Sequence, residues 1–434
     1  MAKILADLSP IIPKVQEMHM PIIPIKYQNF IKKKSSYLLI MLLILGIVSC
    51  QGEYANDQLP VIDPITSNNK FDLLDYIESL EYIPLKENDA SLLSQIVKMV
   101  RTTDQYIVKC HQRSSLFFYD LNGNFIKKLV ATGEGPYQFS NLMDIAYDKH
   151  TNRIFLLDFE EKKILTYDIN QNTISQDNRI LDLHGQSLFH YKSRLYSIVP
   201  KNEAGRVKIF DDQSVNKINE GVFDNSSFNF IATQNSMNTY QDTLFICASF
   251  TDTIYYSINH EIKPYALLGK DNRSLASITN RKEYTQKYLF EEKKMEESEK
   301  KVLVPRGFFS TYRQLWFIEL VWPNKMVIWD KENNIQCLID FRNVKNGALL
   351  FGYQLFKIMY VDDNNFAYSS ITLNKPFYTA AAEVIGHPDR YPPNIVNEVK
   401  KICTQYPEGT YYENPIIVKF KLNTDFTLNH LKSS

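Results

Sequence analysis

The chain has 434 residues, of which 44% are hydrophobic and 23% are charged, a composition typical of a folded protein rather than a disordered one. Its 49 basic residues balance its 49 acidic residues, whereas a nucleic-acid-binding domain is usually strongly basic, so we expect no nucleic-acid partner. The 27 Tyr and 26 Phe residues favour β-strands, because aromatic side chains suit a pleated, half-buried surface.

The N-terminal region has the pattern of a secretory signal. Lys32-Lys33-Lys34 precede an apolar run over residues 38–45, which fits a signal peptide and is shorter than the roughly 20 residues that a membrane-spanning helix needs. The following Ile47-Val48-Ser49-Cys50 resembles a bacterial lipobox, in which the cysteine is diacylated and becomes the mature N-terminus. We therefore expect residues 1–49 to be a signal peptide and Cys50 to carry lipid. The alternative is a signal anchor with an incidental cysteine.

The expected mature protein differs in charge from the full chain. Removal of residues 1–49 leaves 43 basic and 47 acidic residues, a net charge of −4. The N-terminus is also long for a signal peptide, which makes Met18 or Met20 a candidate initiator. We expect residues 50–77 to be a flexible tether and residues 78–434 to be one folded domain. Resemblance to sorted lipoproteins implies an outer-membrane location, anchored through the lipid, on either the periplasmic or the surface face.

The rest of the chain repeats a simple unit of two β-rich runs joined by a polar turn. Asn122-Gly123 predicts a hairpin between residues 115–120 and 125–129, because this dipeptide adopts the positive φ angles of tight turns. The paired runs are 106–110 with 115–120, 153–158 with 163–170, 194–198 with 207–211, 243–247 with 252–256, 314–318 with 326–330, and 365–369 with 415–422.

The spacing of these pairs predicts a propeller. Successive pairs begin 41 to 51 residues apart, except for one interval of 71, and four-stranded propeller blades take about 40–50 residues. We therefore predict an all-β fold, a six-bladed β-propeller of four-stranded antiparallel blades. Residues 279–301 and 388–409 are predicted to be helical insertions. Residues 80–85 are predicted to form a strand that pairs with the last blade and closes the ring.

Several short motifs carry a resemblance to a known family. They are Leu80-Glu81-Tyr82-Ile83-Pro84-Leu85, Gly133-Glu134-Gly135-Pro136-Tyr137-Gln138-Phe139, Asp252-Thr253-Ile254-Tyr255 and Glu413-Asn414-Pro415. In their order and spacing they resemble six-bladed β-propeller lipoproteins of the Bacteroidetes, whose repeats are related to the NHL type. This chain departs from that pattern at Tyr137-Gln138, where the family usually has Gly-Glu.

Gly133, Gly135 and Pro136 are interpreted as a structural turn between blades. A phosphate-binding loop would need a further glycine and a following helix, and Pro136 removes a backbone donor that an anion could use. The chain also lacks a His-Glu-x-x-His zinc motif and a Gly-x-Ser-x-Gly nucleophile motif. We therefore assign no catalytic residue, no metal ligand and no cofactor. The four scattered cysteines after the lipobox are expected to be buried free thiols: Cys110, Cys247, Cys337 and Cys403.

Three functions remain open, and the third, a sensor or structural partner encoded beside a transporter, is not separated from the first by the sequence. The first is a lipid-anchored binding or scaffolding propeller, with an unidentified glycan, peptide or envelope protein as ligand and with specificity in the two helical insertions. The second is a lactonase- or lyase-like propeller enzyme with a metal in the central channel. The acidic residues considered for that metal end predicted strands, where the simpler role is hydrogen bonding to a turn: Asp120, Asp158, Asp168 and Asp330.

Overall fold

The chain divides into two units, Met1–Gln58 and Leu59–Ser434, and the residues that the computed structural model describes all belong to the second. The predicted signal peptide, Cys50 and the predicted helix at 279–301 lie outside the described residues. The described residues are 59–63, 77–86, 92–110, 115–131, 133–180, 185, 187–198, 207–211, 217–221, 236–240, 242–247, 253–269, 305–310, 315–320, 325–331, 335–340, 350, 358–362, 364, 366–410, 412 and 414–422.

The described strands form five sheets of four antiparallel strands and one sheet of five strands. Three of the sheets, taken in chain order, contain β3 (Ile96–Arg101), β4 (Gln105–Cys110), β5 (Ser115–Asp120) and β6 (Phe125–Val130); β7 (Leu142–Asp148), β8 (Arg153–Asp158), β9 (Lys163–Asp168) and β10 (Thr173–Ile180); and β11 (Ser187–Tyr191), β12 (Arg194–Ile198), β13 (Val207–Asp211) and β14 (Lys217–Gly221).

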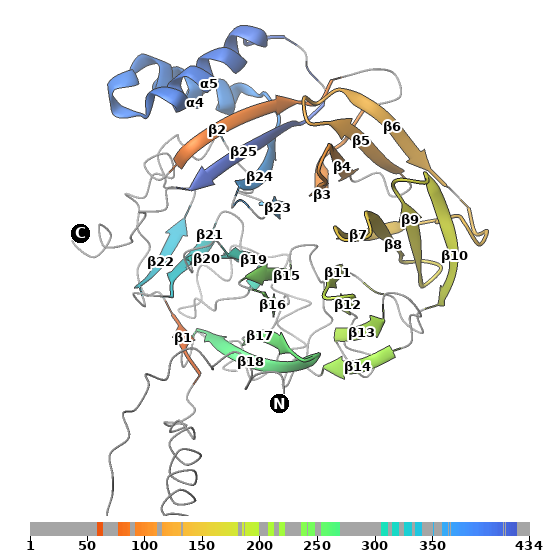
Figure 1. Ribbon diagram of the computed structural model, residues 1–434. Coiled ribbons are helices and arrows are strands. Elements are labelled where there is room, and N and C mark those ends of the chain that lie inside the picture. The colour runs from red at the N-terminus through yellow and green to blue at the C-terminus, as the bar shows by residue number, and fades with distance from the viewer. Residues whose placement is uncertain are drawn as a thin grey trace, which may run out of the picture. The chain divides into compact units, whose positions relative to one another are not determined.

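The other three sheets include the two in which distant parts of the chain meet. They contain β15 (Met237–Tyr240), β16 (Thr243–Ile246), β17 (Thr253–Ile258), β18 (Glu261–Leu268) and β1 (Val61–Ile62); β19 (Pro305–Ser310), β20 (Leu315–Leu320), β21 (Lys325–Asp330) and β22 (Ile335–Asp340); and β23 (Tyr360–Val361), β24 (Phe366–Ile371), β25 (Ile416–Leu422) and β2 (Ile77–Pro84). The sheets follow one another around a common centre (Figure 1). The all-β, propeller-like prediction is confirmed, and each predicted pair of runs forms adjacent antiparallel strands.

The burial of the strands explains their composition. Every residue of β4 is buried, and so are the first five residues of β5, because both faces of these middle strands are covered by neighbouring sheets. Strands covered on both faces have continuous apolar runs rather than an alternating pattern. The outermost strand β6 has no fully buried residue, and its side chains alternate between partly buried and exposed.

Six apolar clusters of described residues fill the junctions between successive sheets, and each combines residues of two neighbouring sheets. For example, Phe118 of β5 and Leu156 of β8 belong to one cluster, and Leu157 of β8 and Leu188 of β11 belong to the next. Each sheet therefore depends on both of its neighbours to remove its apolar faces from water.

The ring closes where the two ends of the domain pair. β2 pairs antiparallel with β25, with Leu80 opposite Phe420, which confirms the strand predicted at 80–85. Asn414 of the Asn-Pro motif is fully buried beside this pair: its side-chain oxygen accepts from Leu93 N at 2.8 Å, and its amide donates to Leu85 O at 3.1 Å. This one side chain therefore holds both ends of the connection from β2 to β3.

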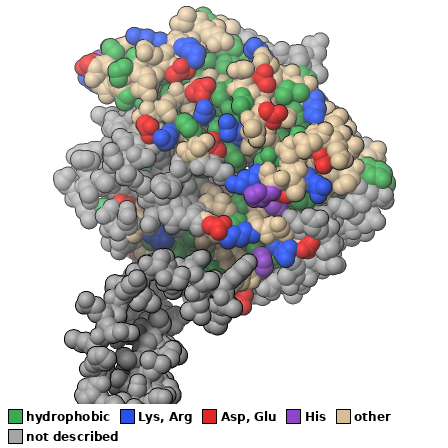
Figure 2. Space-filling model, viewed as in Figure 1, with side chains coloured by type: hydrophobic (Ala, Val, Ile, Leu, Met, Phe, Trp, Pro, Cys, Tyr) green, Lys and Arg blue, Asp and Glu red, His purple; other side chains and the backbone are tan. Residues whose placement is uncertain are grey.

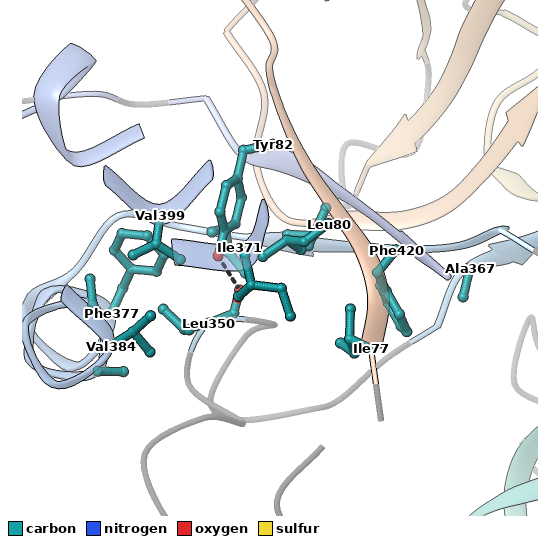
Figure 3. Packing of buried hydrophobic residues seen from close by; sticks show 14 of the residues in the cluster. Ile77, Leu80, Tyr82, Leu350, Ala367, Ile371, Phe377, Val384, Val399 and Phe420 are labelled. Atoms are coloured by element: carbon teal, nitrogen blue, oxygen red, sulfur yellow. Dashed lines mark hydrogen bonds between the residues drawn. The ribbon is translucent and has the colours of Figure 1, made fainter. Parts of the chain in front are cut away.

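Two α-helices between β24 and β25 cover this closing sheet. They are α4 (Lys375–Gly386) and α5 (Pro393–Gln405), separated by the short 3-10 helix η5 (Pro388–Arg390). The buried positions of α5 are Ile395, Val396, Val399 and Ile402, which confirms the helical spacing predicted for 388–409. The apolar sides of both helices join the cluster that contains Tyr82 and Leu80 of β2 (Figure 3).

Helix α4 was not predicted from the sequence, although a local signal for it exists. Asn374 caps the helix by accepting a hydrogen bond from Phe377 N at 3.0 Å, and a proline stands in the first turn. Asparagine at the N-cap and proline at the first helical position are both favourable there. Phe377 then packs edge-on against Tyr82, with 5.9 Å between the ring centroids.

Gly123 tests whether the turn between β5 and β6 requires a glycine. Its φ angle is +79°, and a Cβ atom there would lie 2.1 Å from the carbonyl oxygen of Pro84. We expect Gly123→Ala to lower the free energy of unfolding by at least about 1–2 kcal/mol, because an L-residue is strained in this conformation. Thermal and urea unfolding followed by circular dichroism measure the change.

Gly386→Ala is the matched control, because a Cβ atom at Gly386 meets nothing within 4 Å. This variant should unfold within about 0.5 kcal/mol of the unmodified protein, as surface substitutions generally do. Equal stability of the two alanine variants would contradict the role given to the Gly123 turn.

Candidate functional site

The inner strands of the sheets surround the centre of the ring, and charged residues on two of them, β3 and β7, are buried. The inner strands are β3, β7, β11, β15, β19 and β23 (Figure 1). Lys98 of β3 and Asp144 of β7 form an ion pair with 2.8 Å between Nζ and Oδ2, and their side chains are 10% and 0% exposed. Charges buried to this degree are costly unless they are paired and hydrogen-bonded.

The pair also reaches the next sheet through the backbone of Leu188 on β11. Lys98 Nζ donates to Leu188 O at 3.1 Å, and Asp144 Oδ2 accepts from Leu188 N at 2.7 Å. Burial raises the pKa of the Asp144 carboxyl, although the nearby Lys98 ammonium opposes this. Two charged side chains thus connect three successive sheets.

A second charged group lies at the other end of the same inner strands. His190 Nδ1 lies 3.8 Å from Asp148 Oδ1, and the imidazole stacks on Phe155 with 5.5 Å between the rings. Burial acts to raise the pKa of Asp148, but hydrogen bonds from Thr151 and the backbone of His150 outweigh it, so that the pKa is lowered. Asp148 is therefore an ionised acceptor at neutral pH rather than a proton donor.

A third group joins β3 to the closing sheet. Tyr368 donates to Asp362 Oδ2 at 2.8 Å, and Arg101 Nη1 lies 3.8 Å from the same oxygen. Burial raises the pKa of Tyr106 to about 12, and burial together with the hydrogen bond to Asp362 raises the pKa of Tyr368. Both hydroxyls are therefore protonated at neutral pH, so Tyr368 remains a hydrogen-bond donor.

The inner-strand charges thus lie beside partners of opposite charge or beside polar side chains across sheet junctions. Among the residues that the structure describes, no three His, Cys, Asp or Glu side chains are grouped so that they could hold a metal ion. On the face shown in Figure 2, acidic and basic side chains are interspersed over the described part of the surface. What the described arrangement supplies is a set of sheets around a common centre, with charged side chains on its inner strands.

The four aspartates considered for a channel metal lie at strand ends in turns, and the structure does not bring them together. Asp120 accepts from the backbone of Asn122 at 2.9 Å, and Asp168 accepts from Asn170 N at 2.9 Å. Asp158 accepts from Glu160 N at 3.1 Å in the turn that follows it, and also from Ser140 N at 2.7 Å in the β6–β7 connection. Asp120, Asp158 and Asp330 belong to strands of three different sheets. For Asp120, Asp158 and Asp168, hydrogen bonding to a turn explains why an acidic residue ends the strand.

Gly133, Gly135 and Pro136 lie in the connection from β6 to β7, that is, between two sheets. Gly133 has φ +146°, and a Cβ atom there would lie 2.1 Å from Oε1 of Gln138. That oxygen accepts from Gly135 N at 3.0 Å, and Lys163 Nζ donates to Gly135 O at 3.1 Å. The backbone groups of the motif are thus bonded to the protein itself.

The described cysteines carry no disulfide. Cys110, Cys247 and Cys337 are buried free thiols, as expected, and Cys403 on α5 is only partly buried. Burial raises the pKa of Cys247 and of Cys403, which makes these thiols less reactive because the thiolate is the nucleophile.

The inner-strand charges were not identified from the sequence. The available signal was a single charge inside an apolar run, Lys98 within Ile96–Arg101 and Asp144 within Leu142–Asp148. Such a residue needs a buried partner, but the sequence alone does not identify the partner 46 positions away.

A double-mutant cycle tests the Lys98–Asp144 pair. We expect Lys98→Met to lower the free energy of unfolding by about 3–5 kcal/mol, because it leaves a buried carboxylate without its counter-charge. The double variant Lys98→Met/Asp144→Leu should recover much of that loss, since an apolar pair can replace a buried ion pair at little cost. Urea unfolding gives both values.

Lys401→Met is the control for this cycle, because Lys401 is 60% exposed and pairs with Glu398 at 3.1 Å on the surface of α5. Its effect should stay below about 1 kcal/mol. A Lys98→Met effect as small as that of the control would show that the inner pair contributes little to the ring.

Comparison with known proteins agrees with this architecture. Residues 57–421 match a family model described as a domain of unknown function, DUF4934. No curated protein matches the chain. A candidate exported protein from Bacteroides fragilis NCTC 9343 has a similar structure, with a TM-score of 0.60, 12% identity, and coverage of 84% of this chain and 99% of that chain.

Two further structures have weaker similarity. A DUF4221 member from Bacteroides vulgatus ATCC 8482 has a TM-score of 0.43 and 12% identity over 80% of this chain and 97% of its own. The extracellular domain of a candidate one-component system from B. thetaiotaomicron has a TM-score of 0.40 and 13% identity over 68% of this chain and 36% of its own. At 12% identity, the likeness to the B. fragilis protein concerns the fold alone. Because the family model covers most of the sequence, the chain belongs to the DUF4934 family.

Proposed function

We propose that this chain is a cell-envelope lipoprotein, anchored through Cys50 in the outer membrane, and that its sheets are the blades of one closed six-bladed propeller that serves as a binding or scaffolding module. The blade count is supported by the sheets of the described residues and by the six apolar junctions between them. The similar exported protein of Bacteroides fragilis supports the envelope location.

The observation that carries the binding role is the helical layer on the closing sheet. α4 and α5 bury their apolar sides against β2 and leave a polar surface outward, which includes Asn397 and Lys400 of α5. The antiparallel pairing of β2 with β25 and β25 with β24 is complete without the helices, so they are an addition to the ring. Long insertions in compact domains are commonly functional, and this one is held rigidly by its core.

The partner is a glycan, a peptide or another envelope protein, and its recognition is assigned to the α4–α5 surface and to the insertion at 279–301. Neither described α-helix, of 12 and 13 residues, is long and apolar enough to span a bilayer. The proposed membrane attachment is the lipid at Cys50, and stable anchoring needs two acyl signals.

The lipid anchor is tested by Cys50→Ala. We expect this variant to move from the membrane fraction to the soluble fraction of cells, because it has no thiol to acylate. Immunoblots of both fractions, with the unmodified chain beside it, measure the distribution. Retention of the variant in the membrane fraction would contradict the anchor.

The binding surface is tested by changing its charge. We expect the double variant Asn397→Arg/Lys400→Glu to reduce at least several-fold the envelope components that co-purify with the unmodified chain after crosslinking in cells. Both side chains are exposed on α5, so the fold should be retained. Quantitative mass spectrometry and glycan analysis of the purified material give the readout.

Lys149→Glu, an exposed substitution in the turn between β7 and β8, is the control and should retain the full set of components. Equal losses from the control and the α5 variant would reject the assignment of binding to α5. If the unmodified chain co-purifies with no more envelope components than an unrelated lipoprotein does, the binding role itself is rejected.

A further inference from the structure

The segment that follows the proposed lipid anchor is docked on the ring. Residues 59–63 lie within the span expected to be a flexible tether, yet Val61 and Ile62 form β1, which pairs in parallel with Leu267 and Leu268 of β18. Leu267 N donates to Pro60 O and Gly269 N donates to Ile62 O, both at 2.8 Å. The segment thus occupies the outer edge of this sheet.

The neighbouring sheet holds the same segment from the other side. Gln336 of β22 accepts from Asp63 N at 2.6 Å and donates from Nε2 to Val61 O at 2.7 Å. Ile62 is fully buried in the junction between the two sheets, in a cluster with Leu268 of β18 and Val327 of β21. β1 is therefore fixed by backbone pairing, by a side-chain amide and by apolar burial at once.

The length of chain before β1 limits where the ring can lie. Nine residue steps separate Cys50 from Leu59, and an extended chain of that length reaches about 30 Å. A compact unit the size of Leu59–Ser434 has a radius of gyration of about 21 Å, or roughly 50 Å across. A lipid at Cys50 can therefore approach the edge that carries β1 far more easily than the edge across the ring, where β6 lies (Figure 1).

We propose that β1 makes the outer edge of the β15–β18 sheet the membrane-facing side of the ring, with the lipid surface as its partner. This inference rests on the proposed lipidation of Cys50 and adds an orientation to it. The β6 edge then faces away from the lipid, and the docked segment shortens the tether to the residues between Cys50 and Leu59.

Energy transfer from two sites on the ring tests the orientation. The lipidated full-length chain, with Cys403→Ser to remove the partly exposed thiol, receives a fluorophore through either Lys263→Cys on β18 or Lys128→Cys on β6. Both lysines are exposed on outer strands. In vesicles of phosphatidylethanolamine and phosphatidylglycerol with acceptor-labelled headgroups, we expect several-fold greater transfer from the β18 site.

Release of β1 should abolish this difference. Ile62→Asp introduces a charge at a fully buried position, whereas Val61→Asp changes a neighbour that is 37% exposed and should leave β1 docked. We expect the transfer from the two sites to become equal in the Ile62→Asp chain and to stay unequal in the Val61→Asp chain. Circular dichroism melting shows that the rest of the ring remains folded in both.

The outcomes separate this inference from the lipid anchor. Failure of the chain to associate with vesicles would reject the lipidation of Cys50. Association with equal transfer from both sites, or with unequal transfer that persists in the Ile62→Asp chain, would overturn the orientation by β1 while the anchor stands.

Discussion

The structure depends on the burial of apolar sheet faces against neighbouring sheets. A single four-stranded sheet with continuous apolar strands such as β4 and β5 would expose both faces to water. Each face is covered only because another sheet follows. The free face of the β3–β6 sheet is covered by the sheet in which β2 pairs with β25. Ring closure is thus the condition under which every other sheet is stable, and it joins residues more than 300 positions apart.

Polar groups are placed where they reinforce this constraint. Lys98 and Asp144 link three inner strands, while Asn414 ties the start of the closing strand to the connection between β2 and β3. A buried ion pair adds little stability compared with an apolar pair, but it penalises any arrangement that separates the charges. The inner layer therefore favours one registry of neighbouring sheets. Helices α4 and α5 and strand β1 lie at the outer side of the ring of sheets. They pack into the apolar clusters at the two junctions that flank the β19–β22 sheet.

Particular residues show how far local patterns extend. The Asn122-Gly123 turn, the repeated pairs of runs and the apolar spacing of α5 follow from the chemistry of a few adjacent residues, and they were predicted. Helix α4 was missed because its cap and proline are short-range signals without a long apolar period. β1 was missed because a two-residue strand has no pattern of its own. Its stability comes from β18 and Gln336, about 200 and 275 positions later.

The sequence by itself determined the fold class, the strand repeats and the strand that closes the ring, because hydrophobic patterning and turn chemistry act between near neighbours and dictate which faces must be buried. Only the tertiary structure decided which buried charges meet, that three of the strand-end aspartates bond turns rather than one another, and that the segment after the proposed anchor is docked. These depend on contacts between distant residues, and such contacts exist only once the sheets have assembled around a common centre.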